Sequence, residues 1–208
     1  MVKKNQTNSD SIQFHPATAS RWADLEELFG ERGACGGCWC MFWRLPRKTF
    51  DSGKGAANKR ALKKLVSEER EPGILAYLGN EPIAWCAIAP RAEYSALERS
   101  RILKPVDDKS VWSVSCLFIR KPYRRQGVSA KLLGAAVAFA ATHGAQVVEG
   151  YPVEPSMEKM PDPFLWHGIP SAFMKAGFKE VLRRSKSRPI MRCEISSATP
   201  IRKRSSSD

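Results

Sequence analysis

The residues best arranged for chemistry in this 208-residue chain form a basic turn between a predicted strand and a predicted helix. An apolar, β-branched run over 111–119 leads into Arg124, Gly127 and Ser129, and an Ala- and Leu-rich helix follows over 127–143. Such a junction directs backbone N–H groups and the positive end of a helix dipole at one spot, and glycine lets an anion approach the backbone closely. The spacing R-x-x-G-x-S therefore predicts a phosphate or pyrophosphate site.

Two familiar phosphate-binding patterns are missing from the chain. Neither the dinucleotide-binding G-x-G-x-x-G nor the P-loop G-x-x-x-x-G-K-S/T occurs. A basic turn before a helix also arises as a solvated cap, so the turn alone leaves two interpretations open.

The turn and two later segments together resemble the GNAT superfamily of acyl-CoA-dependent N-acyltransferases. In that family the pyrophosphate motif R/Q-x-x-G-x-G/A follows a phrase similar to V-x-P-x-Y-R, which corresponds here to Ile119 to Arg124. The family ends with a helix bearing Gly-Phe and two long strands, which correspond to Phe173 to Val181 and Pro189 to Ile195. The likeness covers about residues 11 to 195.

The resemblance implies an α/β fold with a mixed, mostly antiparallel sheet of about six to seven strands flanked by helices. A single domain is expected over 11–195, between polar, disordered tails at 1–10 and 196–208. Periodicity and turn residues give the elements. The predicted strands are 12–15, 74–78, 83–89, 111–119, 146–151, 178–184 and 189–195, and the predicted helices are 17–29, 55–69, 127–143 and 170–176.

Three connections between these elements are expected to lack regular structure. One is a loop rich in glycine, cysteine and tryptophan that runs to about Phe50, and another is a charged segment over 91–108. The third, Pro152 to Pro163, is rich in proline and methionine and is expected to form part of a substrate wall.

Bulk composition is that of a globular protein, with 43% hydrophobic and 26% charged residues. No apolar run approaches the ~20 residues needed to cross a bilayer, and the basic N-terminus lacks the apolar segment of a secretory signal. Six cysteines without such a signal favour reduced thiols in the cytoplasm.

The net charge of +13 favours acidic partners in general. We attribute the positive charge to general solubility and to attraction of the coenzyme A phosphates, since no pattern of a specific nucleic-acid-binding module is present. No specific nucleic-acid partner is therefore expected, and no membrane partner is expected either.

The resemblance also implies how acetyl-CoA, as co-substrate, would be held. Backbone groups of the central strand would pair with pantetheine, and amides from Arg125 to Ala130 would take the pyrophosphate. The acyl carbonyl oxygen would meet a backbone N–H between Cys116 and Phe118. The expected cofactor-binding residues are Leu117, Phe118, Ile119, Arg124, Arg125, Gln126, Gly127, Val128, Ser129 and Ala130.

Transfer to an amine requires a base, because a lysine-like amine has a pKa near ~10.4. Glu149 is the leading candidate, directly or through water, because it lies on the strand beside which the acceptor would enter in the family. A rim carboxylate paired with an arginine is the competing interpretation of Glu149. Glu93, after the third strand, is the second candidate, with a solvated loop charge as its alternative.

Protonation of the leaving thiolate is less well defined. Where the family often carries a tyrosine acid, this chain has Phe173, so either Tyr151 substitutes or the thiolate leaves unassisted. Tyr151 has packing as its alternative role. A covalent relay through Cys116 is a further hypothesis, against which stands the packing role of most buried cysteines. His167 titrates near neutrality in principle, but isolated loop histidines are mostly structural.

A C-x-x-C-x-C motif, Cys35 to Cys40, lies in the first long loop. It offers three soft ligands where structural zinc takes four, so no metal is expected. The aromatic residues Trp39, Phe42 and Trp43 of this loop either line an acceptor pocket or close over the core.

The leading hypothesis is an N-acetyltransferase that transfers the acetyl group of acetyl-CoA to a primary amine by direct attack in a ternary complex. The alternatives are a non-catalytic acyl-CoA sensor and a redox or zinc regulator built on the cysteine loop. The acceptor is open among small amines, aminoglycosides, peptide N-termini, lysines and charged tRNA. The oligomeric state is open as well, a homodimer included.

Overall fold

The computed structural model describes residues 11–155 and 165–195. The predicted tails, and most of the Pro- and Met-rich loop, lie outside the described residues. The strands are β1 Ile12–Pro16, β2 Gly73–Leu78, β3 Glu81–Pro90, β4 Trp112–Ile119, β5 Val147–Gly150, β6 Lys179–Arg183 and β7 Pro189–Glu194. The helices are α1 Trp22–Phe29, α2 Arg47–Ser52, α3 Ala56–Ser67, α4 Ser95–Glu98, α5 Val128–Thr142 and α6 Pro170–Lys175, with 3-10 turns η1 Ala19–Arg21, η2 Arg91–Glu93 and η3 Lys121–Tyr123.

Every predicted strand and helix is found, and the differences lie in the connections. Helix α2 falls inside the predicted cysteine loop, and η2 and α4 fall inside the predicted charged segment. Both helices are short, and each buries one side chain, Phe50 in α2 and Leu97 in α4. A single buried position gives no helical periodicity, so the sequence pattern cannot reveal such helices.

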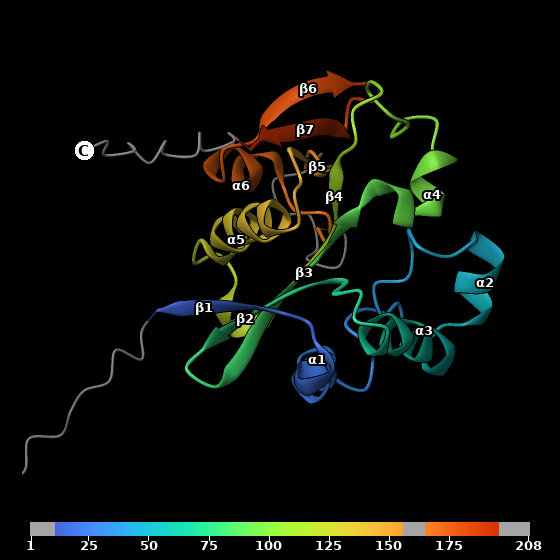
Figure 1. Ribbon diagram of the computed structural model, residues 1–208, viewed down its shortest axis with the longest axis vertical. Helices are drawn as coiled ribbons and strands as arrows, with labels where there is room; N and C mark the ends of the chain where they lie inside the picture. The colour runs from blue at the N-terminus through green and yellow to red at the C-terminus, as the bar shows by residue number, and fades with distance from the viewer. Residues whose placement is uncertain (1–10, 156–164, 196–208) are drawn as a thin grey trace, which may run out of the picture.

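The strands form one seven-stranded sheet in the order β1-β2-β3-β4-β5-β7-β6. Every neighbouring pair is antiparallel except β4 and β5, which are parallel. The expected mixed, mostly antiparallel sheet is therefore confirmed, and Figure 1 shows β4 at its centre.

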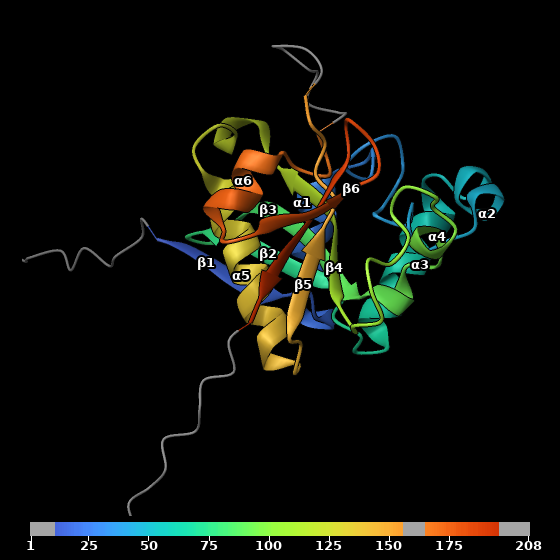
Figure 2. The same ribbon diagram turned by 90° about the horizontal axis from the view of Figure 1, so that it is seen from above.

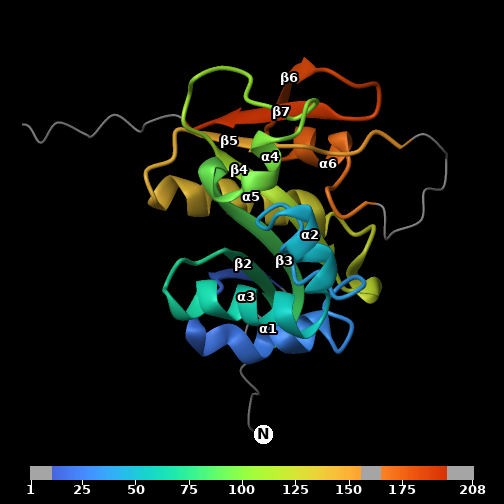
Figure 3. The ribbon, with the colours of Figure 1, turned by 90° about the vertical axis from the view of Figure 1, so that its right-hand side faces the viewer.

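Helices cover both faces of the sheet. Helices α5 and α6 pack together on one face, where Leu132, Leu133 and Ala136 of α5 are fully buried. Helix α1 packs on β3 from the other face. Figure 2 shows α2, α3 and α4 grouped on one side of the sheet, away from α5 and α6, and Figure 3 shows α1 and α3 side by side along β2 and β3. No helix among residues 11–155 and 165–195 is long and apolar enough to cross a membrane.

Strand β4 changes its surroundings at a bulge. In the pairing of β3 with β4, Ala87 faces Cys116 and Ile88 faces Val114, which leaves Ser115 as the extra residue. Strand β5 pairs with β4 only along 112–114. Beyond the bulge the edge of β4 therefore separates from β5, and this opening positions the candidate site.

Candidate active site

The basic turn has the backbone of an anion-binding loop. Arg125 and Gly127 both have left-handed φ angles, +61° and +76°, on either side of Gln126. The Gln126 side chain donates to the Pro122 carbonyl at 2.7 Å and closes the turn. No side chain caps the first turn of α5, which begins at Val128, so its leading amides have no intrahelical partner. Such alternation of backbone conformation gathers N–H groups into a concavity suited to an anion.

The Ala130 amide, one of the amides predicted to bind the pyrophosphate, donates to the Gly127 carbonyl at 3.2 Å. Arg124 donates from Nε to the Ile119 carbonyl at 2.8 Å, which ties the turn to the end of β4.

The turn borders a cavity of about 330 Å³, here called the turn cavity. Its wall combines the basic turn, the free edge of β4 and the start of α6. Its lining residues are Ala34, Cys35, Leu117, Phe118, Ile119, Arg124, Arg125, Ser129, Leu165, Trp166, Gly168, Ile169 and Ala172.

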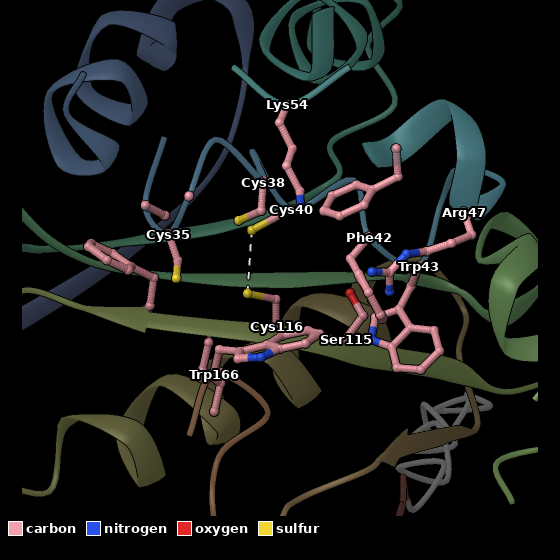
Figure 4. A pocket seen from close by; sticks show the side chains of 15 residues that line it. Cys35, Cys38, Cys40, Phe42, Trp43, Arg47, Lys54, Ser115, Cys116 and Trp166 are labelled. Atoms are coloured by element: carbon pink, nitrogen blue, oxygen red, sulfur yellow. Dashed lines mark hydrogen bonds between the residues drawn. The ribbon is translucent and has the colours of Figure 1, made fainter. Parts of the chain in front are cut away.

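A second cavity of about 500 Å³, here called the loop cavity, lies under the cysteine loop and α2 (Figure 4). Five residues line both cavities: Ala34, Cys35, Leu117, Phe118 and Trp166. The other residues of the loop cavity are Gly36, Cys38, Cys40, Phe42, Trp43, Arg47, Phe50, Lys54, Ser115 and Cys116. The two cavities therefore meet at the edge of β4 beyond the bulge.

The cysteine loop is fixed over this cavity by backbone contacts and by one buried amide. Asn58, only 1% exposed, donates to the Phe50 carbonyl at 3.2 Å and to the Gly37 carbonyl at 3.4 Å. Gly37 has φ +75°, and a Cβ there would lie 2.4 Å from the Gly55 nitrogen. Only glycine fits this close approach.

Trp166 separates the two cavities. Its carbonyl accepts a hydrogen bond from the Leu117 amide at 2.6 Å, and its ring lies 5.4 Å from that of Phe42 and 6.5 Å from that of Trp43. The Leu117 amide, which was expected to pair with a cofactor, is therefore paired with the chain's own backbone in this structure.

Four of the six cysteines line the loop cavity, and all six are free. Cys40 donates to Cys116 Sγ at 3.4 Å and accepts from Trp85 Nε1 at 3.2 Å. The hydrogen bond to Cys116 and burial together raise the pKa of the Cys40 thiol. The contact of Cys38 with Cys40, together with burial, raises the pKa of the Cys38 thiol. Such protonated thiols are poor nucleophiles. Within the described ranges, no group of three or more His, Cys, Asp or Glu side chains is arranged to hold a metal ion.

The aromatic residues of the loop divide between the two roles considered for them. Phe42 and Trp43 line the loop cavity. Trp39, 3% exposed, instead stacks between Trp22 and Phe29 in the core, at centroid distances of 6.1 and 5.4 Å.

Glu149 lies in a buried ion-pair cluster and does not line either cavity. Its carboxylate, 1% exposed, accepts from Arg192 Nε at 2.7 Å, from Arg91 Nη1 at 3.3 Å and from the Tyr151 hydroxyl at 2.6 Å. Two guanidinium groups and the Tyr151 hydroxyl enclose the carboxylate, so its oxygens are engaged within the cluster and face neither cavity. This arrangement argues against the prediction that Glu149 is the base.

The other predicted acid and base candidates also lie outside both linings. Tyr151 is fully buried and is hydrogen-bonded to Arg91 and to Ser113 at 2.6 and 2.9 Å. Burial and the Glu149 charge hold the pKa of its hydroxyl well above the usual value. Glu93 pairs with Arg44 and with Arg70. Of the predicted catalytic residues, Cys116 alone lines a described cavity.

Phe173 is a core residue rather than a cavity residue. It is fully buried and packs edge-on against Phe178 at 5.0 Å. A Cβ at Gly150 would lie 2.1 Å from its ring. No acid can act from this position, because the side chain carries no ionisable group and points into the core.

The sequence predicts mostly a structural role for His167, yet its surroundings in the fold are unusual. It is 3% exposed, and its ring lies 3.5 Å from that of Trp166 and 5.6 Å from that of Trp43. Neither ring nitrogen has a well-aligned hydrogen-bond partner among the described residues, and a weaker contact with the Ser115 backbone acts on the imidazole. Burial, and then the nearby Arg188 charge, hold its pKa well below the usual value. The imidazole is therefore neutral at pH 7. Its isolation in the sequence gave no signal of this environment.

Comparisons with known proteins agree with this architecture. The family model described as "Acetyltransferase (GNAT) family" matches residues 39–157. A search of curated proteins finds no match.

Three solved structures share the fold at low sequence identity. A GNAT-family acetyltransferase from Listeria monocytogenes is 7% identical, with a TM-score of 0.54, and the match covers 90% of this chain and 97% of that one. A GNAT-family acetyltransferase from Streptococcus agalactiae is 11% identical, with a TM-score of 0.52, and the match covers 89% of this chain and 96% of that one. A protein from Pyrococcus horikoshii is 12% identical, with a TM-score of 0.51, and the match covers 90% of this chain and 100% of that one. At these identities the likeness establishes the fold alone.

Proposed function

Because the chain belongs to the GNAT acetyltransferase family, we propose that it transfers an acetyl group from acetyl-CoA to a primary amine by direct attack in a ternary complex. The observation that carries this proposal is the meeting of the two cavities at the free edge of β4. One cavity ends at an anion-binding turn, and the other offers a separate space for an acceptor. The transfer then takes place at their shared wall.

The phosphates of the cofactor belong at the basic turn in this proposal. Arg124, Arg125 and Ser129 border the turn cavity, and the leading amides of α5 face a region without a capping side chain. Amides at a helix N-terminus combine hydrogen bonds with the helix dipole, which favours a pyrophosphate.

Pantetheine would lie along the edge of β4 from Ile119 to Leu117. In this structure the Leu117 amide donates instead to the Trp166 carbonyl, which is the same kind of acceptor as a pantetheine amide oxygen. Pantetheine pairing at this amide requires the Trp166 carbonyl to give way. Support for acetyl as the acyl group comes from the family description alone.

The acceptor ammonium must lose its proton, and the described residues that line the loop cavity include neither carboxylate nor imidazole. We assign this role to His167 acting through a water. Its ring does not line either cavity, but it is neutral and contacts Trp43 and Trp166, which line the loop cavity. A neutral imidazole accepts a proton as the amine attacks.

The direct test is calorimetry with acetyl-CoA, followed by thiol release with a panel of primary amines. We expect saturable binding and amine-dependent release of coenzyme A. Absence of binding at millimolar acetyl-CoA contradicts the proposal.

The second candidate is a non-catalytic acyl-CoA sensor, which is favoured by Phe173 in place of an acid and by the lack of a carboxylate among the described residues of the cavity wall. Acetyl-CoA binding without thiol release for any amine would identify it. A regulator based on the cysteine loop is less well supported, because the thiols of Cys38 and Cys40 are held protonated. The six free cysteines agree with our proposal that the protein works in the reducing cytoplasm.

A further inference from the structure

The loop cavity has a one-sided charge. Among the residues that the structure describes, its charged lining residues are Arg47 and Lys54, and no aspartate or glutamate lines it. A cavity lined by charges of one sign attracts ligands of the opposite sign and repels those of the same sign.

These two cations are held in place by one carboxylate beside the cavity. Arg47 Nε donates to the Asp51 carboxylate at 2.5 Å, and Lys54 Nζ lies 3.2 Å from the same carboxylate. The hydrogen bond from Arg47 lowers the pKa of the Asp51 carboxyl. One negative charge thus faces two positive charges, which leaves a net positive charge at this wall. Figure 4 shows the Arg47 and Lys54 side chains directed toward the cavity.

The space between the cations and β4 is aromatic. The Phe42 ring lies edge-on to those of Trp43, Phe50 and Trp166 at 4.9, 5.3 and 5.4 Å. Arg47 and Lys54 also lie over aromatic rings, those of Phe42 and Phe50, each at 5.5 Å. Such walls bind a flat apolar body, and about 500 Å³ is within the usual size range for a small-molecule site.

The two ends of the cavity differ in chemistry. Cys35, Phe118 and Trp166, at one end, also line the turn cavity, where the thioester would arrive. Figure 4 shows Arg47 away from Cys35, on the other side of Trp166. An acceptor that fills the cavity therefore has its amine at the β4 edge and its distal group at the cations.

Resting on the proposed function, we propose that the acceptor is a primary amine joined through an aromatic spacer to an anionic group, such as a carboxylate. The amine lies at the shared wall, the ring lies among Phe42, Trp43 and Trp166, and the anion binds Arg47 and Lys54. The carboxylate gains charge-assisted hydrogen bonds there. Polycationic acceptors such as polyamines and aminoglycosides are repelled.

Three amines with one frame and different distal charges test this inference. The probes are 4-(aminomethyl)benzoate, benzylamine and 1,4-bis(aminomethyl)benzene. We expect kcat/KM for the benzoate to exceed that for benzylamine about tenfold or more, and the diamine to be the poorest acceptor. An order in which the diamine or benzylamine equals or exceeds the benzoate overturns the inference and leaves the acetyltransferase proposal standing.

Variants assign the preference to the two cations. Arg47→Gln and Lys54→Gln should each lower the benzoate-to-benzylamine ratio of kcat/KM severalfold, and the double variant should abolish it. Lys48→Gln is the matched control, because it removes one positive charge from the helix that carries Arg47, and Lys48 lines neither cavity. A control variant that lowers the ratio equally contradicts the assignment.

A binding measurement separates the inference from the proposed function. Calorimetry of the full chain with coenzyme A present should show tighter binding of 4-(aminomethyl)benzoate than of benzylamine, lost in the double variant. That result without turnover of any amine refutes the transferase proposal and supports the anion site. Turnover of benzylamine without preferential benzoate binding does the reverse.

Discussion

The two halves of β4, on either side of the Ser115 bulge, show opposite uses of the same strand. Before the bulge, Ser113 lies beside β5 within a buried network of Tyr151, Glu149 and two arginines. After the bulge, Cys116 to Ile119 border two cavities. Beside the first half, ionisable groups of neighbouring elements join those elements together, while the second half offers backbone groups, the Phe118 ring and the Cys116 thiol.

This difference teaches where chemistry is to be sought in the fold. The carboxylates near β4, those of Glu93 and Glu149, form ion pairs with arginines, and these pairs connect the sheet to its neighbouring segments. In the proposed function, the open half depends on a cofactor, on the amide edge of β4 and on the His167 imidazole.

Glu149→Gln should have the largest effect, a loss of about 3–5 kcal/mol in the free energy of unfolding. The amide leaves two buried guanidinium groups without their counter-charge. Chemical denaturation measures it, with the surface variant Glu154→Gln as control, for which about 0–1 kcal/mol is expected. Unchanged stability with lost turnover would instead make Glu149 the base.

His167→Asn should lower kcat about 100-fold or more, the size of a lost general base, and should leave acetyl-CoA affinity within a few-fold. Because the pKa of His167 is held below its usual value, the rate of the unaltered protein should fall with acid only well below pH 6.5. That fall should be absent from the pH profile of the variant. A variant with the same profile and a proportionate loss of folded protein would show a structural role only.

Phe173→Tyr should cost about 1–3 kcal/mol of stability without raising kcat, because the hydroxyl enters the tight contact with Gly150. Thermal unfolding measures it. Phe139→Tyr, on a partly buried ring of α5, is the control. A rise in kcat would show that position 173 reaches the thiolate after all.

Ser129→Glu should weaken acetyl-CoA binding about tenfold or more, equivalent to ~1.4 kcal/mol, by placing a negative charge in the turn cavity. Ser67→Glu, at the end of α3, adds the same charge outside both cavities and should leave the affinity unchanged. Equal affinity in both variants would place the pyrophosphate elsewhere.

Asp107→Asn should have the smallest effect, visible only above acid pH. Two hydrogen bonds from Arg192, at 2.7 and 3.0 Å, lower the pKa of the Asp107 carboxyl. Its stabilising contribution is therefore present above its ordinary pKa and is lost as the pH falls through the lower folded value. Denaturation at a series of pH values from 7 downward should show a gap between variant and parent at pH 7 that narrows as the pH falls below 3.8. A gap that stays the same down to the lowest pH at which the protein is folded contradicts this linkage.

Much of the fold was predictable because its elements carry strong local patterns. The continuous apolar run of β4 and the Ala-rich α5 were placed within one residue at each end. The two short helices were not, since each buries a single side chain. Of the predicted cofactor residues, Leu117, Phe118 and Ile119 line the turn cavity, whereas Ala130 is occupied by its own helix turn.

The sequence by itself determined the basic turn, its glycine and the strand and helix on either side, because these depend on neighbours in the chain. Only the tertiary structure decided the partners of Glu149, which come from 58 and 43 residues away, and the meeting of Cys40 with Cys116 across 76 residues. Those contacts follow from strand register and from the bulge at Ser115. Local composition does not encode either, because register is set by the packing of the whole sheet.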